Sequence, residues 1–224
     1  MRSVGYVSKT SIEARAAAWL KTIRGEVAPR PQFALDPRRA ALLVIDMLRY
    51  FADPDGRCYL PAAGVIVPRL AALLEAWRAA GAVVVFTRHA HAGPQDLGML
   101  GKFFSDYIRL GEPDAEIVAA LAPLPGEPVL RKTTYDAFQG TELAEILAGR
   151  GAEQVVVTGV LTHMCCDTTA RAAFCRGYEV YMPVDGTAST TEKRHVNALS
   201  NLADSVAIVT SVAELIARCR MSRS

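Results

Sequence analysis

Several features that would assign this chain to a particular class of protein are missing from its 224 residues. No apolar stretch approaches the roughly 18 residues that a membrane-spanning helix requires, so we expect no membrane partner. The 25 Lys and Arg residues form no clustered run and stand against 23 Asp and Glu, which leaves a formal net charge of +2. So small an excess of positive charge argues against a nucleic-acid partner.

The five cysteines form neither a disulfide framework nor a zinc ribbon, because their number is odd and no C-x-x-C pair occurs. Two of them, Cys165 and Cys166, are sequence neighbours. The N-terminal segment MRSVGYVSKTSIEAR also lacks the apolar region of a signal peptide. We therefore expect a cytoplasmic protein whose cysteines are free thiols.

Apolar runs rich in branched residues alternate with helical patterns along the chain, of which 51% is hydrophobic and 21% charged. Because parallel strands need crossover connections, this alternation predicts an α/β fold class with three α/β/α layers and a six-stranded, parallel, doubly wound sheet. The expected strands are 40–47, 82–87, 128–132, 154–160, 178–184 and 205–210. The expected helices are 11–23, 65–80, 114–122, 141–149, 164–176, 191–203 and 211–219.

The chain is long enough for one domain, which we expect over residues 38–224. Residues 1–37 are expected to form an N-terminal helix and a Pro-rich arm. Residues 89–112 carry glycines and aromatics without clean periodicity, which is typical of a long excursion that forms a lid.

Three residues of suitable chemistry follow predicted strands, at the sheet edge where parallel sheets place their sites. Alone, Asp46 could be a satisfied buried carboxylate, Lys132 a solvated lysine and Cys165 a helix-packing thiol. Together they are chemically coherent, because the start of a helix, with Thr162 as its N-cap, and a nearby ammonium lower the pKa of a thiol. A carboxylate in reach can take the thiol proton and return it to a leaving group.

The segment GVLTHMCCDTTARAAFCRGYEVYMPVDGTAS (159–189) resembles the isochorismatase-like cysteine hydrolases. ALLVIDMLRYF (41–51) and LRKTTYDAF (130–138) match the same family, and the similarity extends over roughly residues 38–218. The G-V-x-T-x-x-C…T-A-x-x-A-x-x-x-G-Y pattern is long and specific.

The resemblance implies a catalytic triad of Asp46, Lys132 and Cys165. It also implies an oxyanion hole made by the backbone N–H groups of Leu161 and Cys165, with a cis peptide bond entering Leu161. A small-molecule substrate, no cofactor, and a homodimer or homotetramer are the further expectations.

The family contains enzymes that cleave C–N bonds through the cysteine, and isochorismatases that hydrolyse a vinyl ether with the aspartate as acid. Isochorismatases carry Gly at the nucleophile position, followed by Cys. This chain has Cys165 at the nucleophile position and the isochorismatase-like Cys166 and His163 beside it. We give Cys165 the greater weight and expect hydrolysis of an amide, ureido or carbamoyl substrate through a thioester. The alternatives are vinyl ether hydrolysis that releases pyruvate, with Asp46 as general acid, and a non-catalytic binding or assembly subunit.

The expected substrate-binding residues flank these motifs: Phe51, Arg88, Tyr135, Phe138 and His163. Phe103, Phe104 and Tyr107 lie on the candidate lid. The family's D-x-Q pattern is Asp46-Met47-Leu48 here, which favours an apolar ligand or one that is held from elsewhere.

The similar nicotinamidases have an Asp-x-His metal site plus a later His, where this chain has His89-Ala90-His91 and no further His before His163. We therefore predict no metal. His195 is expected to be exposed on its helix, and Trp19 to pack the N-terminal helix, onto a neighbouring subunit in one interpretation.

Overall fold

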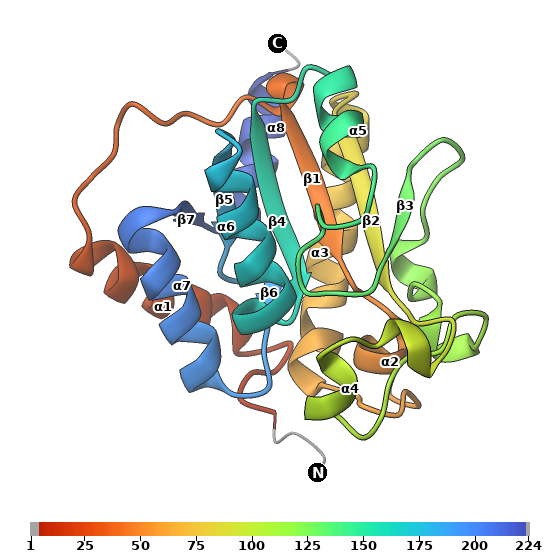
Figure 1. Ribbon diagram of the computed structural model, residues 1–224. Helices are drawn as coiled ribbons and strands as arrows, with labels where there is room; N and C mark the ends of the chain where they lie inside the picture. The colour runs from red at the N-terminus through yellow and green to blue at the C-terminus, as the bar shows by residue number, and fades with distance from the viewer. Residues whose placement is uncertain (1–4, 223–224) are drawn as a thin grey trace.

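A twisted parallel sheet forms the centre of the computed structural model, which describes residues 5–222 (Figure 1). The strand order is β3-β2-β1-β4-β5-β7, and all pairs are parallel. The strands are β1 (Ala40–Ile45), β2 (Val83–His89), β3 (Val129–Lys132), β4 (Gln154–Val160), β5 (Glu179–Pro183) and β7 (Ala207–Thr210). The six predicted strands are confirmed, and the sheet gains a two-residue strand β6 (Thr187–Ala188) that pairs with β4.

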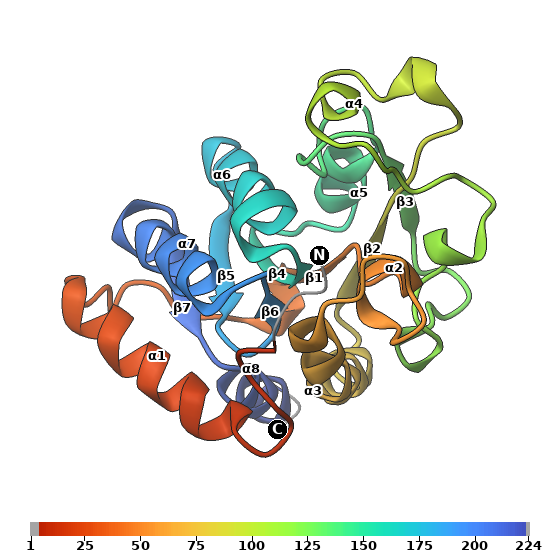
Figure 2. The ribbon, with the colours of Figure 1, turned by 90° about the horizontal axis from the view of Figure 1, so that it is seen from below.

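Helices cover both faces of the sheet and complete the three layers. Seen from below, α3 and α8 lie on one face, and α5, α6 and α7 lie on the other (Figure 2). Helix α1 lies beside α7 and β7, at one edge of the sheet. The helices are α1 (Ile12–Glu26), α2 (Arg49–Ala52), α3 (Pro61–Ala79), α4 (Leu100–Phe103), α5 (Leu143–Gly149), α6 (Asp167–Cys175), α7 (Glu192–Ser205) and α8 (Val212–Met221). Within residues 5–222, no helix is long and apolar enough to cross a membrane.

The central strands β1 and β4 are buried along their whole length, which explains their uninterrupted apolar sequences. At their carboxyl ends Gly159 has φ +99°, and a Cβ there would lie 2.0 Å from the carbonyl oxygen of Ile45. Only glycine fits so close an approach. This contact brings the residues that follow β1 and β4 together at one edge of the sheet.

The predicted helix over 114–122 is wrong. The segment consists of two single 3₁₀ turns, Pro113–Ala115 and Ala119–Leu121. Between them the chain is paired across to the residues after β1: Arg49 N–H donates to Glu116 O at 2.8 Å, and Val118 N–H donates to Met47 O at 3.0 Å. These long-range bonds replace the hydrogen bonds that a helix would make.

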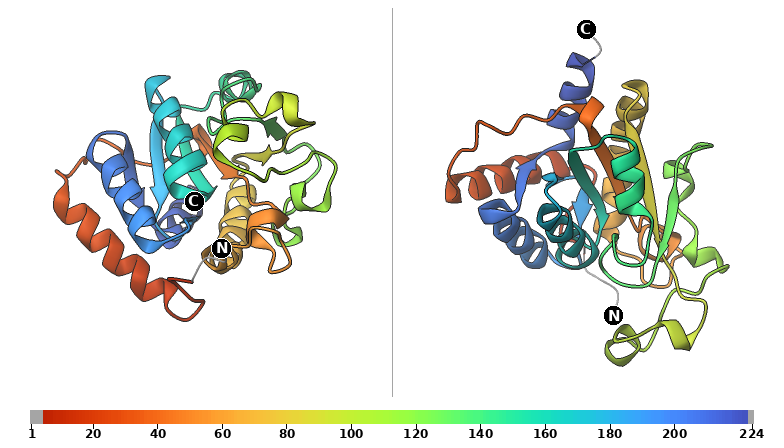
Figure 3. Two further views of the ribbon diagram at one scale, coloured as in Figure 1. Left: turned by 60° about the horizontal axis from the view of Figure 1, so that its bottom comes forward. Right: turned by 45° about the horizontal axis from the view of Figure 1, so that its top comes forward.

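Residues 90–118 extend beyond the carboxyl ends of the strands, with α4 at their outer end (Figure 3). A small apolar cluster of Leu48, Tyr50, Ala90, Ile108 and Ala115 joins this excursion to the residues after β1. The excursion therefore forms a separate layer over the edge at which the sheet carries its ionisable side chains.

Candidate active site

Four adjacent strands deliver the side chains of the site. Asp46 follows β1, His89 ends β2, Lys132 ends β3, and β4 leads through Leu161 into a π-helical turn, Thr162–Cys166, that carries Cys165. His89 and Lys132 are register partners in the β2–β3 pair. The peptide bond between Val160 and Leu161 is cis, as the resemblance implies.

The structure brings the three predicted residues together around the Lys132 ammonium. Lys132 Nζ lies 2.7 Å from Asp46 Oδ2 and donates to Cys165 Sγ at 3.3 Å and to Thr134 O at 3.0 Å. The second carboxylate oxygen, Asp46 Oδ1, accepts a hydrogen bond from Thr87 Oγ1 at 2.6 Å. All three predicted residues are buried, so their charges interact with little screening by water.

The electrostatics assign a resting charge state to the triad. Burial opposes ionisation of Asp46, but the Lys132 ammonium holds the pKa of this carboxyl below its ordinary value. Burial likewise opposes charge on Lys132, but Asp46 raises its pKa. The site therefore contains a carboxylate and an ammonium at neutral pH.

The expectation that Cys165 has a lowered pKa is wrong. Burial raises the pKa of its thiol to about 12, and this outweighs the opposing effect of Lys132. The nearby Asp46 carboxylate raises it further, because a second negative charge beside it is unfavourable. Cys165 thus rests as a thiol beside a carboxylate that can accept its proton.

A cavity of about 510 Å³ opens above the triad. Asp46 and Cys165 line it, together with three predicted contacts, Phe51, Tyr135 and His163. Leu161, Phe104 and Tyr107 also line it, whereas Phe103 is 76% exposed and is not among the lining residues.

Two predicted substrate contacts lie elsewhere. Arg88 points to the opposite side of β2 from its neighbour Thr87 and forms an ion pair with Glu116 at 2.9 Å. Phe138 stacks on the Tyr178 ring, with the Arg176 guanidinium 4.6 Å from its own ring centre. Neither residue lines the cavity.

Sequence reasoning missed several lining residues. Leu97, Leu100 and Ile108 belong to the irregular excursion, where no periodicity marks a side chain as facing the site. Cys58, Met164 and Arg194 also line the cavity. The predominantly apolar set agrees with the apolar ligand that the missing Gln favours.

The predictions for His195 and Thr162 are wrong, for one shared reason. His195 is fully buried, and Thr162 caps no helix because its hydroxyl is 2.8 Å from His195 Nδ1. His195 Nε2 lies 2.9 Å from Val184 O, and burial lowers the pKa of this imidazole to about 4. The neutral His195 ring donates a hydrogen bond from Nε2 to Val184 O, so its Nδ1 is unprotonated and accepts a hydrogen bond from the Thr162 hydroxyl. The contact ties α7 to the turn that carries Cys165.

Trp19 of α1 covers His195, with the two ring centres 4.9 Å apart in an edge-on arrangement. Its indole N–H donates to Glu192 Oε1 at 2.9 Å. Trp19 therefore packs within its own chain, against α7. No pattern in the sequence predicts that α1 lies over this face.

The donors present do not match a metal site. Among residues 5–222, the group of three potential ligands is Asp46, His89 and Cys165, whose ligand atoms lie within 4.8 Å of one another. The Lys132 ammonium already contacts all three of these side chains. His89 and His91 face each other with their Nε2 atoms 3.0 Å apart, and no third ligand joins this pair in the described part of the chain. Structural and catalytic zinc sites use three or four protein ligands.

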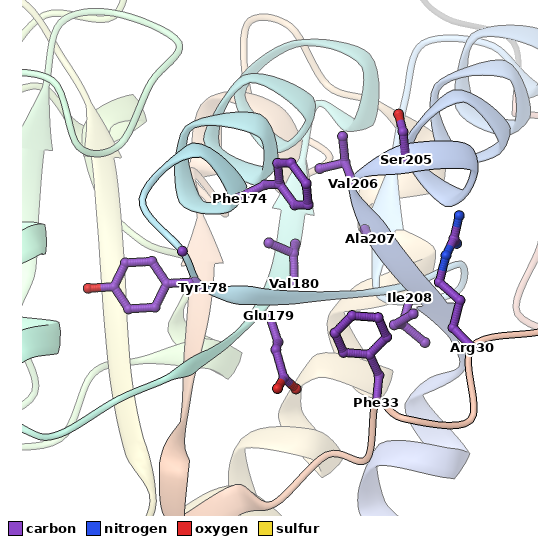
Figure 4. Close-up of a pocket in the computed structure, with 11 residues that line it drawn as sticks. Arg30, Phe33, Phe174, Tyr178, Glu179, Val180, Ser205, Val206, Ala207 and Ile208 are labelled. Atoms are coloured by element: carbon purple, nitrogen blue, oxygen red, sulfur yellow. The ribbon is translucent and has the colours of Figure 1, made fainter.

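A second cavity, of about 370 Å³, lies at the amino ends of β5 and β7 (Figure 4). Its two charged residues are engaged within the fold, since Arg30 donates to Ala203 O at 2.6 Å and Glu179 accepts from Gln154 at 2.7 Å. No cysteine or histidine lines it. The chemistry of the molecule is therefore concentrated in the cavity above Cys165.

Comparison with known proteins agrees with this geometry. The family model of the isochorismatase domain matches residues 40–214. A nicotinamidase of Arabidopsis thaliana (Nicotinamidase 3) is 40% identical over 167 residues, which cover 73% of this chain and 80% of the relative. A probable isochorismatase of Pseudomonas chlororaphis is 30% identical over 188 residues, covering 83% and 88%. The crystal structure of a cysteine hydrolase from Pseudomonas syringae superposes with a TM-score of 0.82 at 29% identity, covering 87% of this chain and 99% of that one.

Proposed function

The chain belongs to the isochorismatase family of hydrolases, and from its site we propose that it cleaves the C–N bond of a small amide, ureido or carbamoyl compound through Cys165. The observation that carries this proposal is the contact of the Cys165 thiol with Lys132, beside the ionised Asp46 and at the cavity wall. A thiol so placed can attack a carbonyl carbon as soon as a neighbouring base removes its proton.

The proposed reaction begins with transfer of the Cys165 proton to Asp46 as the sulfur attacks the substrate carbonyl. As Asp46 becomes protonated, negative charge develops on the sulfur instead, and the Lys132 ammonium stabilises it there. The backbone N–H groups of Leu161 and Cys165 bind the carbonyl oxygen while it carries negative charge. Asp46 then donates the proton to the departing amine, and the acyl group remains on sulfur as a thioester. Water attacks this thioester, and its proton returns through Asp46 to the Cys165 thiolate.

Vinyl ether hydrolysis is the second candidate, because His163 and Cys166 match that branch of the family and a probable isochorismatase is among the relatives. It requires Asp46 to begin the reaction as an acid. The lowered pKa of Asp46 beside Lys132 instead favours a base, which supports C–N cleavage.

The two reactions are separated by one pair of variants. Cys165→Ala removes the proposed nucleophile, whereas Cys166→Ala removes the neighbouring buried thiol, which donates to Thr158 O at 3.8 Å. The enzyme and both variants are assayed with a pool of small primary amides and ureido acids for ammonia or amine release, and with isochorismate for pyruvate release.

We expect amine release that Cys165→Ala lowers by roughly 10³-fold or more and that Cys166→Ala retains. Mass spectrometry of the acid-quenched enzyme should show the acyl group on Cys165. Pyruvate release that survives Cys165→Ala and is lost in Asp46→Asn would instead establish vinyl ether hydrolysis. A protein inactive on both pools, with no acyl adduct, would contradict the proposal and return the chain to a binding role.

A further inference from the structure

The Lys132 ammonium has more neighbours than protons to donate. Asp46 Oδ2, Thr134 O, His89 Nδ1 and Cys165 Sγ lie 2.7, 3.0, 3.2 and 3.3 Å from Nζ. An ammonium carries three N–H donors and no acceptor. Its orientation therefore depends on which neighbours can accept a hydrogen bond, and in the resting enzyme the tautomer of His89 decides whether its Nδ1 can accept one.

The positions of the ring protons follow from the contacts of both imidazoles. The contact between His89 Nε2 and His91 Nε2, at 3.0 Å, needs one donor and one acceptor. His91 Nδ1 lies 3.1 Å from Asp96 O and 3.3 Å from Asp96 Oδ1, two oxygens that only accept, so the proton of His91 is on Nδ1 and its Nε2 accepts. The ring proton of His89 is then on Nε2, and its Nδ1 is unprotonated and faces the Lys132 ammonium.

The far end of this chain of hydrogen bonds is itself fixed. Asp96 Oδ2 accepts from Arg131 at 3.0 Å and from the backbone N–H of Ala92 at 3.0 Å. Arg131 and Lys132 are consecutive on β3, so their side chains leave opposite faces of the strand. Lys132 contacts the start of the chain of hydrogen bonds at His89, and Arg131 binds its end at Asp96.

We propose that His89 and His91 are positioning residues that hold the Lys132 ammonium between Asp46 and Cys165, and that they do so as a metal-free pair of imidazoles with fixed, opposite tautomers. The role of Lys132 in catalysis rests on the proposed function. The arrangement of the imidazoles rests on geometry alone and has its own test.

Burial and polarity are consistent with this arrangement. His91 is 1% exposed, and its backbone is bound on both sides by the excursion, with Ile108 O and Leu110 N–H each at 2.9 Å. Burial and then the Lys132 charge lower the pKa of His89 to about 4, so this ring is neutral where the enzyme would work. A proton added at His89 Nδ1 would point at the ammonium.

The direct test uses the wild-type protein. The chain has four histidines, so the ring nitrogens can be assigned in a ¹⁵N-labelled sample by two-bond ¹H–¹⁵N correlation at pH 7. We expect His89 with the proton on Nε2 and His91 with the proton on Nδ1. Metal analysis after dialysis against EDTA should find no bound divalent ion. The same tautomer on both rings, a doubly protonated His89, or one retained equivalent of metal would overturn the proposal.

Variants test the effect on Lys132. His89→Asn keeps an oxygen near the position of Nδ1, whereas His89→Leu removes the acceptor at similar volume. We expect His89→Leu to slow the alkylation of Cys165 by iodoacetamide, which peptide mapping measures. We also expect this variant to lower kcat by roughly ten- to a hundredfold with little change in KM, since misplacement of a catalytic group by about 1 Å can cost that much. His89→Asn should restore most of both.

The two readouts separate failure of this inference from failure of the proposed function. Alkylation and ring NMR need no substrate, so they report on the imidazoles even if no amide is hydrolysed. Equal alkylation rates in the wild type, His89→Leu and His89→Asn would contradict a positioning role.

Discussion

Burial favours the neutral form of three histidine side chains in this protein. His89 and His195 each have a pKa lowered to about 4, and His163 is shifted in the same direction, in all three cases chiefly by burial. In the unfolded chain a histidine has an ordinary pKa of about 6.5. Between these two values the unfolded state therefore binds protons that the native state does not.

This difference predicts acid sensitivity well above the range of the carboxyl groups. Because the unfolded state binds more protons, the free energy of unfolding should fall as the pH falls from 6.5 towards 4, by about 3 kcal/mol for each fully shifted histidine. The lowered pKa of Asp46 acts in a separate window below about pH 4, where its protonation removes stability.

Urea unfolding between pH 7 and pH 4.5 measures the effect. His195→Gln should show a shallower decline than the wild type, because one of the contributing rings is gone. A free energy of unfolding that is constant over this range would contradict the buried neutral state of the histidines.

At the scale of secondary structure elements, α1 supports the turn that carries the candidate nucleophile. The contacts run from Trp19 on α1 to His195 on α7 and from His195 to Thr162 in the turn. Tyr6, which precedes α1, also packs near His195 and accepts from Ser189 N–H at 3.2 Å. Helix α1, which lies outside the segment that resembles the family, therefore contacts the residues that support the turn carrying Cys165.

Trp19→Ala should remove this support. We expect a loss of about 3–5 kcal/mol in the free energy of unfolding, as for other buried tryptophans, with a fall in kcat under the proposed function. Phe33→Ala is a matched control, because Phe33 is an aromatic residue of the same N-terminal region, is 37% exposed and lines the second cavity. Chemical denaturation and a kinetic assay compare the two variants. An equal loss of stability and activity in both would exclude a specific role for Trp19.

The sequence predicted these elements where local pattern and burial agree. The apolar runs of β1 and β4 are unambiguous because both strands are buried on both faces. The pattern of residues 114–122 predicts a helix that does not form, because the hydrogen-bond partners of this segment, Met47 and Arg49, lie far away in the sequence. The burial of His195 is not predictable from the pattern of its own helix, because that pattern does not show which other element covers the side chain. The grouping of Asp46, Lys132 and Cys165 was predictable, since strand ends in a parallel sheet share one edge.

Across the whole molecule, the site depends on the correct pairing of four neighbouring strands, β3-β2-β1-β4. Asp46 and Cys165 come from the interior of the sheet, where the strands are fully buried. Lys132 comes from β3, a four-residue strand at the edge, of which Lys132 alone is buried. The ammonium that completes the site is thus supplied by the least protected part of the sheet.

An edge strand with one neighbour can open without the rest of the protein unfolding. When β3 separates from β2, Lys132 leaves its partners while β1, β4 and β5 remain paired. Catalytic activity should therefore disappear at lower urea concentration than far-UV ellipticity, and β3 amides should exchange hydrogen faster than those of β4. Superimposable curves for activity and ellipticity would contradict this. The loss of turnover should thus report local opening of β3 at one edge of the sheet. Cross-linking β3 to β2 should extend the range of urea concentration over which the protein is active without altering the chemistry.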